Sequence, residues 1–321
     1  CGRNHGESFC SAVCIKGSKG RHSRAGGNPH MYITVLGNPT YCYTGGKPFD
    51  AAKPTVVFIH GVLNDHSVWI LQTRYLAHHG FNVLAADLPG HGKSAGPNRD
   101  VAPCKTVEEA ADFIIALLDT AEIKSAALVG HSFGSLIAIE ATARDTAKNP
   151  NRIKHLALLG TAAPMLVSPV LLETSISAPN QAIDMVNTFS HSMLAPPPSA
   201  LGPGTWLYGS SKALMRRVQA SNAAHNLFHL GFTACNDYKN AVDVISIASA
   251  AILFIAGKAD QMTPPKAARP LMEAAKEAAK ASGKAVKVVT LDAGHQMMTE
   301  APDGVLMALK DFLEPLKSIS A

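Results

Sequence analysis

Residues 125–148 contain a serine whose surroundings suit a nucleophile. An apolar run at 126–129 is long enough only for a buried strand, and the Ala-rich segment from Phe133 onward has apolar residues at helical spacing. Between them lies G-H-S-F-G at 130–134, a G-x-S-x-G pattern in the strand–turn–helix context that this motif requires. So sharp a turn exposes the serine hydroxyl, and a glycine-rich turn that merely contains a serine is the weaker interpretation. Ser132 is therefore the predicted nucleophile.

A serine hydroxyl is a poor nucleophile at neutral pH and needs a base within hydrogen-bond reach. A histidine takes the proton, and a carboxylate holds that histidine in the right tautomer. His295 lies in a loop after a predicted strand, where the preceding glycine indicates a tight, exposed turn; a buried structural histidine is the alternative. Two carboxylates are candidates: Asp260, in the loop after a strand that ends at 255, and Asp292, which could instead cap a turn.

The elements that must position these residues alternate along the chain. Strands are predicted at 32–36, 41–43, 55–59, 81–86, 126–129, 155–159, 251–255 and 286–291, and helices at about 65–79, 107–120, from 133 onward, 265–281 and 302–316. This alternation predicts an α/β fold with a mostly parallel central sheet flanked by helices on both faces. It breaks at 164–245, where short helical patterns without a convincing buried strand indicate a helical insertion.

The chain is therefore expected to have three parts. Residues 1–30 are polar, rich in Gly, Ser and Arg, and without periodicity, so they are predicted to be disordered. Because the sequence as written begins with Cys, Met31 is the expected start of the native protein. The core is expected over 31–163 and 246–321, with the insertion at 164–245 between its two halves.

Five short motifs stand in order at strand ends: F-I-H-G-V at 58–62, D-L-P-G-H-G-K-S at 87–94, G-H-S-F-G at 130–134, G-K-A-D at 257–260 and A-G-H at 293–295. Together they resemble the α/β-hydrolase superfamily over about residues 32–318. The resemblance implies the α/β-hydrolase fold, with the insertion as a helical lid or cap. It also implies the chain order nucleophile, acid, histidine, which assigns Ser132, Asp260 and His295 to catalysis and leaves Asp292 as the rival acid.

The same resemblance gives roles to backbone groups and to neighbouring side chains. The reaction builds negative charge on a carbonyl oxygen, and the backbone N–H groups of Val62 and Phe133 are the expected donors of the oxyanion hole. His60 and His91 are expected to shape the site rather than to act as bases. Asp87 is expected to be structural, since a carboxylate can cap the turn that follows it.

The substrate pocket has several candidate residues. Met262 and Met297 lie two residues beyond the predicted acid and histidine, so a pocket role is as plausible for them as core packing. Trp206 and Met185, both in the insertion, are further candidates, as is the side chain of Phe133.

The expected function is a serine hydrolase that cleaves a small, largely apolar ester or related acyl compound through an acyl-enzyme. C–C bond hydrolysis, lactone opening, thioester cleavage and acyl transfer with the same residues stay open. So does a ligand-binding protein on a hydrolase scaffold, which the presence of all three catalytic residues makes the weaker hypothesis. An epoxide hydrolase or haloalkane dehalogenase would need Asp at position 132 and is excluded by the serine.

The composition limits the number of domains, the relation to a membrane and the redox compartment that fit this chain. The chain has 321 residues, 47% hydrophobic and 17% charged, which fits one large α/β domain with an insertion or two domains. No apolar run approaches the roughly 20 residues that span a bilayer, and no secretory signal is visible, so stable membrane insertion is not expected. Six scattered cysteines without C-x-x-C or zinc spacing favour a reducing, cytoplasmic setting.

The positive charge does not indicate a nucleic-acid partner. The net charge is +5, but residues 1–30 hold five basic residues and one acidic residue, so the rest of the chain carries a net charge of only +1. No basic stripe with interleaved aromatic residues follows, which argues against nucleic-acid binding. The expected partner is a small-molecule acyl substrate, with no metal and no organic cofactor, and no pattern predicts an oligomeric state.

Overall fold

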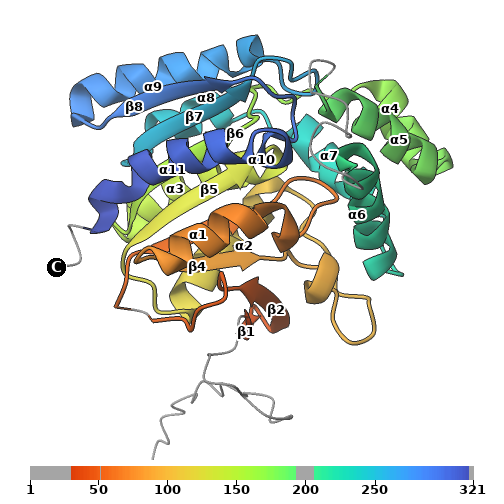
Figure 1. The fold of residues 1–321 in the computed structure, drawn as a ribbon, viewed down its shortest axis with the longest axis horizontal. Helices are drawn as coiled ribbons and strands as arrows, with labels where there is room; N and C mark the ends of the chain where they lie inside the picture. The colour runs from red at the N-terminus through yellow and green to blue at the C-terminus, as the bar shows by residue number, and fades with distance from the viewer. Residues whose placement is uncertain (1–29, 51, 193–205, 318–321) are drawn as a thin grey trace, which may run out of the picture.

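The computed structural model describes residues 30–50, 52–192 and 206–317 (Figure 1). The predicted disordered tail lies outside these residues except for His30, which begins the first strand. Eight strands form one sheet in the order β1-β2-β4-β3-β5-β6-β7-β8. Their bounds are β1 His30–Val35, β2 Asn38–Tyr43, β3 Thr55–Ile59, β4 Asn82–Ala86, β5 Ala126–His131, β6 Ile153–Leu159, β7 Ala251–Gly257 and β8 Val286–Leu291.

The sheet is mostly parallel, as predicted. β3 to β8 pair in parallel, whereas β1 pairs antiparallel with β2, and β2 with β4. β3 lies in the middle of the sheet and is buried on both faces. Because alternate side chains of a strand point to opposite faces, such a strand needs a continuous apolar run in the sequence. Val57 and Ile59 join the hydrophobic core on one face, and Val56 and Phe58 join the core on the other.

Helices cover both faces of the sheet (Figure 1). The core of Val57 and Ile59 is closed by α2 Val107–Thr120, α3 Phe133–Lys148, α8 Ala241–Ser246 and α9 Arg269–Ser282. The opposite core is closed by α1 Ile70–His78, α10 Met297–Glu300 and α11 Pro302–Lys317. Short 3-10 turns at His66–Trp69, Gly92–Ser94 and Pro265–Ala268 complete these elements. The prediction of a parallel sheet flanked by helices is thus confirmed.

The start of α2 shows how local sequence fixes a boundary. The Thr106 hydroxyl accepts a hydrogen bond from the N–H of Glu109 at 3.1 Å, and the Glu109 carboxylate accepts one from the N–H of Lys105 at 2.7 Å. Such reciprocal bonds satisfy N–H groups that the first turn of a helix leaves without partners. The predicted bounds 107–120 coincide with those of the helix.

The predicted insertion at 164–245 contains helices between β6 and β7. They are α4 Pro169–Ser177, α5 Pro179–Ser190, α6 Leu207–Ser221, α7 Leu227–Asp237 and all but the last residue of α8. α8 packs against α3 and α9, so it belongs with the layer that covers the sheet. α4 to α7 lie together at one end of the molecule (Figure 1). Residues 193–205 lie outside the described part.

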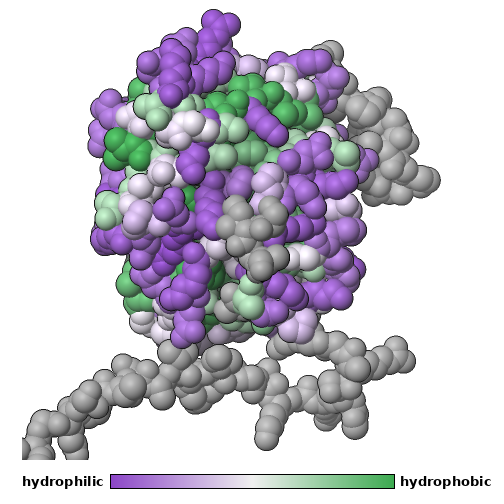
Figure 2. Space-filling model, turned by 90° about the vertical axis from the view of Figure 1, so that its left-hand side faces the viewer, coloured by the Kyte–Doolittle hydropathy of each residue, from purple (hydrophilic) through white to green (hydrophobic). Residues whose placement is uncertain are grey.

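One end of the molecule has a mostly hydrophilic surface. Figure 2 views the side of the molecule that faces left in Figure 1, away from α4 to α7, and hydrophilic residues cover most of it. The hydrophobic residues there gather in separate patches. Among the described residues, no helix combines the length and the apolar character that crossing a membrane requires.

Candidate active site

Ser132 lies on a strained turn between β5 and α3. Its backbone φ is +54°, a left-handed value that L residues rarely adopt. A Cβ atom at Gly130 would lie 2.1 Å from the carbonyl oxygen of Gly134, and one at Gly134 would lie 2.3 Å from the carbonyl oxygen of Ile59. Only glycine fits at either position, so the two glycines of the motif are required by the close passage of strand and helix.

Asp260 and His295 form a buried pair beside this turn. Asp260 Oδ2 lies 2.9 Å from His295 Nδ1, and the exposed fractions of the two side chains are 0% and 6%. Burial by itself raises the pKa of Asp260, but the charge and hydrogen bond of His295, with hydrogen bonds from Thr263, lower it below its usual value. An ionised carboxylate therefore faces Nδ1, which leaves Nε2 of the imidazole for exchange of a proton.

Asp292 does not take this place. Its side chain is 84% exposed and pairs with Lys258, with Nζ 2.6 Å from Oδ1. The structure brings Asp260 to His295, and the rival acid instead lies on the surface.

Two residues support the pair in ways that sequence reasoning missed. The Thr263 hydroxyl donates a hydrogen bond to Asp260 Oδ2 at 2.8 Å, and Thr263 Oγ1 also lies 3.1 Å from His295 Nδ1. His131 Nε2 lies 2.9 Å from the carbonyl oxygen of His295, so its N–H donates a hydrogen bond to that oxygen. Burial, followed by the charge of His295, lowers the pKa of His131 to about 3, which keeps this imidazole neutral. The only signal for His131 was its place directly before Ser132.

His60 and His91 are held by the backbone, which agrees with a shaping role. His60 Nε2 accepts a hydrogen bond from the N–H of Leu88 at 3.0 Å, and its Nδ1 lies 2.9 Å from the carbonyl oxygen of Gly61. Burial lowers the pKa of His60 and lowers that of His91 to about 4. Since both ring nitrogens of His60 are used, it has none left to act as a base toward Ser132.

The expected oxyanion donors lie close to the serine. The loop of Val62 passes beside it, because a Cβ atom at Gly61 would lie 3.2 Å from Cβ of Ser132. The N–H of Phe133 is the first of α3, where a helix leaves its N–H groups without intrahelical partners. Within the part of the chain that the structure describes, neither of these two N–H groups donates a hydrogen bond. Both are therefore available to a developing negative charge.

A cavity of about 500 Å³ opens in front of Ser132 and His295. Most of its other walls are apolar side chains from the insertion and the segment leading into it. They include Met165, Val167, Val170, Leu171, Met185, Val186, Phe189, Phe232 and Cys235, joined by Met262 from the loop after β7. A largely apolar compound of moderate size matches this lining.

The chain matches the model of the alpha/beta hydrolase family over residues 56–308. It belongs to that family. An epoxide hydrolase of Caballeronia sordidicola is 33% identical over 115 residues, which make up 36% of this chain and 32% of that protein. An (E)-2-((N-methylformamido)methylene)succinate hydrolase of Acinetobacter baylyi is 32% identical over 104 residues, 32% of this chain and 36% of that protein. These matches thus span about a third of each relative.

Solved structures share the alpha/beta hydrolase fold over almost the whole chain. An esterase from Exiguobacterium antarcticum superposes with a TM-score of 0.70 and 18% identity, covering 88% of this chain and 98% of the other. At this level of identity the likeness concerns the fold.

In this alpha/beta hydrolase, the predicted pocket residues divide into two groups. Met185 and Met262 line the cavity, as expected. Trp206 does not: it is 57% exposed, and its ring stacks on Tyr208 with 6.1 Å between centroids. Met297 does not either, because it begins α10 and its side chain is fully buried in the core beneath α11. The Phe133 side chain is likewise buried in the core on the α2 side.

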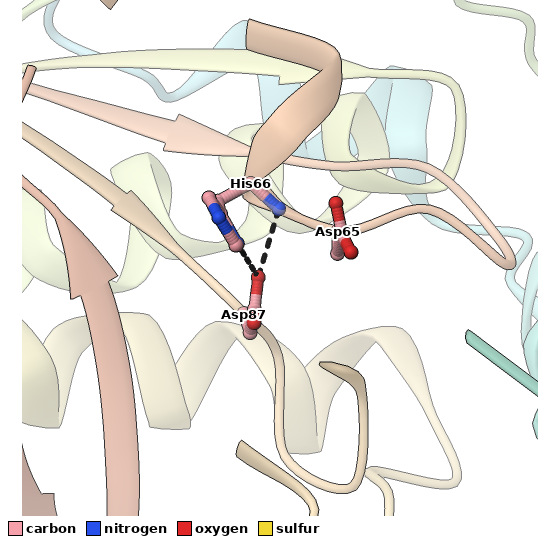
Figure 3. Close-up of side chains that lie close together, drawn as sticks. All are labelled: Asp65, His66 and Asp87. Atoms are coloured by element: carbon pink, nitrogen blue, oxygen red, sulfur yellow. Dashed lines mark hydrogen bonds and ion pairs between the residues drawn. The ribbon is translucent and has the colours of Figure 1, made fainter. Parts of the chain in front are cut away.

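A second group of titratable side chains, Asp65, His66 and Asp87, lies in the segments that follow β3 and β4 (Figure 3). One ligand-type atom from each residue lies within 4.8 Å of the others, a spacing at which three such groups can bind a metal ion. Asp87 Oδ1 accepts hydrogen bonds from the N–H of His66 at 2.8 Å and lies 2.7 Å from its Nδ1. Asp87 Oδ2 accepts one from the N–H of Lys93 at 2.9 Å, which matches the expected capping of that turn.

Asp65 is also used within the protein. Its Oδ1 accepts hydrogen bonds from the N–H and the hydroxyl of Ser67, and its Oδ2 accepts one from Arg217 at 3.1 Å. The carboxylate oxygens of this group therefore all have protein donors, and Arg217 supplies a positive charge. Capping and the contact with α6 account for these residues without a metal ion.

Proposed function

We propose that this chain is a serine hydrolase that cleaves a small, largely apolar carboxylic ester through an acyl-enzyme. One observation carries the proposal: Ser132 and the Asp260-bound His295 line the same apolar cavity. Ser132 is the one residue at the strained turn, and the family's chain order of nucleophile, acid and histidine is kept.

The geometry supports a definite sequence of proton movements. The Ser132 hydroxyl attacks the ester carbonyl carbon while His295 Nε2 takes its proton, and Asp260 stabilises the resulting imidazolium. The carbonyl oxygen becomes negative and accepts hydrogen bonds from the N–H groups of Val62 and Phe133. His295 then gives its proton to the leaving alcohol, and the acyl group stays on Ser132. Water attacks this acyl-enzyme with His295 as base, releasing the acid and restoring the serine.

Lactones, thioesters and acyl transfer would use the same acyl-enzyme, so they remain alternatives within this chemistry. The substrates named for the two relatives, a succinate derivative and an epoxide, do not suit the site of this chain. Among the described residues, no Lys or Arg lines the cavity, so the carboxylates of a succinate derivative would have no cationic partner there. Opening of an epoxide through a carboxylate nucleophile would need Asp where this chain has Ser132.

The second part of the proposal is that α4 to α7 act as a lid that selects the acyl chain. Support comes from the cavity walls, to which α4, α5 and α7 contribute apolar side chains. Each methylene buried in such a pocket contributes about 0.8 kcal/mol, so activity should rise with acyl length until the cavity is filled.

The test is labelling with a fluorophosphonate, followed by intact-mass measurement and by kinetics on p-nitrophenyl esters of increasing chain length. We expect one phosphonyl adduct per chain, no adduct in Ser132→Ala, and a preferred acyl length. Binding of apolar esters without labelling or turnover would contradict the proposal and favour a ligand-binding protein on a hydrolase scaffold.

A further inference from the structure

A second, much smaller cavity adjoins the two reactive residues. Its volume is about 20 Å³, and Ser132 and His295 line it together with Val62, Asn64, His131, Val186, Ser190, Met215, Phe232, Met262 and Gln296. A space of roughly 10–15 Å³ is needed to hold one water molecule, so this cavity has room for one. Polar side chains make up a larger part of its lining than of the lining of the large cavity.

Three residues of this lining each carry a buried polar atom without a partner in the part of the protein that the structure describes. Asn64 Oδ1, His131 Nδ1 and Ser190 Oγ are buried and make no hydrogen bond to any described residue. The residues themselves are at most 2% exposed. A buried polar atom without a partner costs roughly 1–3 kcal/mol, and three around one small space point to a shared ligand.

The hydrogen-bonding capacity of these atoms matches water. His131 is neutral and donates through Nε2 to the carbonyl oxygen of His295, so its Nδ1 can only accept. Asn64 Oδ1 is also an acceptor, whereas the Ser190 hydroxyl can donate. One molecule with two donors and free lone pairs satisfies all three, and it would make about three hydrogen bonds, as buried waters do.

We propose that this cavity holds the water molecule that hydrolyses the acyl-enzyme. The inference rests on the proposed function and deepens it. An acyl chain that fills the large apolar cavity prevents water from reaching Ser132 through that cavity. The small cavity is also lined by Ser132 and His295, so water in it lies beside the acyl group. The stored water attacks the acyl carbon, and its proton passes to His295 Nε2. The bond from the acyl carbon to Ser132 Oγ breaks, His295 returns the proton to Oγ, and a carboxylic acid is released.

The proposal separates the two halves of the reaction. Ser190→Ala and Asn64→Leu each remove one partner of the water, and neither residue takes part in forming the acyl-enzyme. Loss of one hydrogen bond should slow hydrolysis of the acyl-enzyme about fivefold while its formation changes little. Added methanol competes with water for the acyl group, so the ratio of methyl ester to acid should rise by a similar factor.

The measurement is a burst experiment with p-nitrophenyl butyrate, with decay of the acyl-enzyme followed by intact mass. Ser175→Ala is the matched control, since Ser175 is also a fully buried serine of the insertion but bonds Leu172 and His229 and does not line the cavity. Melting temperatures of all variants show whether each one folds. If Ser190→Ala does not fold, Asn64→Leu provides the test.

Slower hydrolysis with an unchanged burst rate in the cavity variants, and not in Ser175→Ala, supports the water site. If formation and hydrolysis of the acyl-enzyme slowed equally, the cavity residues would instead support the oxyanion hole or general packing, and the proposal would be overturned. Unchanged rates of hydrolysis and an unchanged ratio of methyl ester to acid would also overturn it. Failure of the proposed function itself looks different, because the unsubstituted protein would then show no burst and no fluorophosphonate adduct.

Discussion

The carboxylate of Asp260 has every acceptor position filled. Oδ1 accepts hydrogen bonds from the N–H groups of Met262 at 2.9 Å and Thr263 at 2.8 Å, and Oδ2 from the Thr263 hydroxyl and His295. A carboxylate held in this way is fixed in orientation, and so is the imidazole that it bonds. The pair is therefore preorganised for a proton transfer at Nε2.

Asp260→Asn should lower kcat by about 10⁴-fold, because an amide cannot stabilise the imidazolium and favours the wrong tautomer. Asp292→Asn removes a similar charge from an exposed ion pair with Lys258 and should leave kcat within about twofold. Steady-state kinetics on one p-nitrophenyl ester compare the two. Inactivity of the second variant with near-normal activity of the first would show that the acid is misassigned.

Thr263 is expected to act as a positioning residue through its hydroxyl. Thr263→Val keeps the size of the side chain but removes the donor to Asp260, and should lower kcat about tenfold with little change in KM. Thr263→Ser retains the hydroxyl and should restore most of the activity. If valine and serine variants lose activity equally, the methyl group and packing matter instead of the hydrogen bond.

At the scale of elements, the turn that holds Ser132 depends on backbone contact between β3 and α3. A Cβ atom in Gly134→Ala would meet the backbone oxygen of Ile59, which cannot move without shifting a central strand. We expect a loss of about 1–3 kcal/mol in the free energy of unfolding and loss of fluorophosphonate labelling.

Gly304→Ala in α11 is the matched control, since its Cβ would meet only the flexible end of the Leu291 side chain. Thermal melting and labelling of both variants give the comparison. A stable, labelled Gly134→Ala protein would mean that the turn tolerates a side chain, contrary to the geometry.

The insertion helices should control acyl length through α5. Met185 and Phe189 both line the cavity, whereas Trp206 at the start of α6 is exposed. Met185→Ala and Phe189→Ala should therefore shift the optimum of kcat/KM toward longer acyl chains by one or two methylenes. Trp206→Ala should leave the profile across p-nitrophenyl esters unchanged; a shift in this variant alone would place specificity on α6.

These elements show what a sequence can predict. β3 and the turn at Ser132 were predictable because a continuous apolar run and paired glycines report local backbone requirements. Met297 and Trp206 were not, because distance along the chain from a reactive residue says nothing of the direction in which a side chain points. The support from Thr263 depends on contacts between loops, which no local pattern encodes.

At the scale of the whole molecule, histidines whose pKa is lowered are buried in β6 and around the loops that follow β3, β4 and β5. Burial is the largest cause of the lowered pKa in His60, in His91 and His155 (both to about 4), and in His131 (to about 3). The unfolded chain exposes these groups, and their pKa then returns to about 6.5. Between about pH 6.5 and 4 the unfolded state therefore binds more protons than the folded state.

Because the unfolded state binds the extra protons, acidification favours unfolding in this window. The free energy of unfolding should fall as pH is lowered from 6.5 toward 4, by up to about 1.4 kcal/mol per pH unit for each buried histidine. Above pH 6.5 these groups are neutral in both states and add no slope. Urea unfolding at several pH values between 4.5 and 7.5 measures the dependence.

His155 allows this linkage to be tested away from the reactive residues, because it lies in β6 and packs against Phe312 with 5.0 Å between ring centroids. His155→Gln cannot take up a proton, so its slope between pH 6.5 and 4.5 should be shallower by up to about 1.4 kcal/mol per pH unit. Equal slopes in His155→Gln and the unsubstituted protein would mean that His155 binds a proton in the folded state, and its neutral burial in β6 would then be wrong.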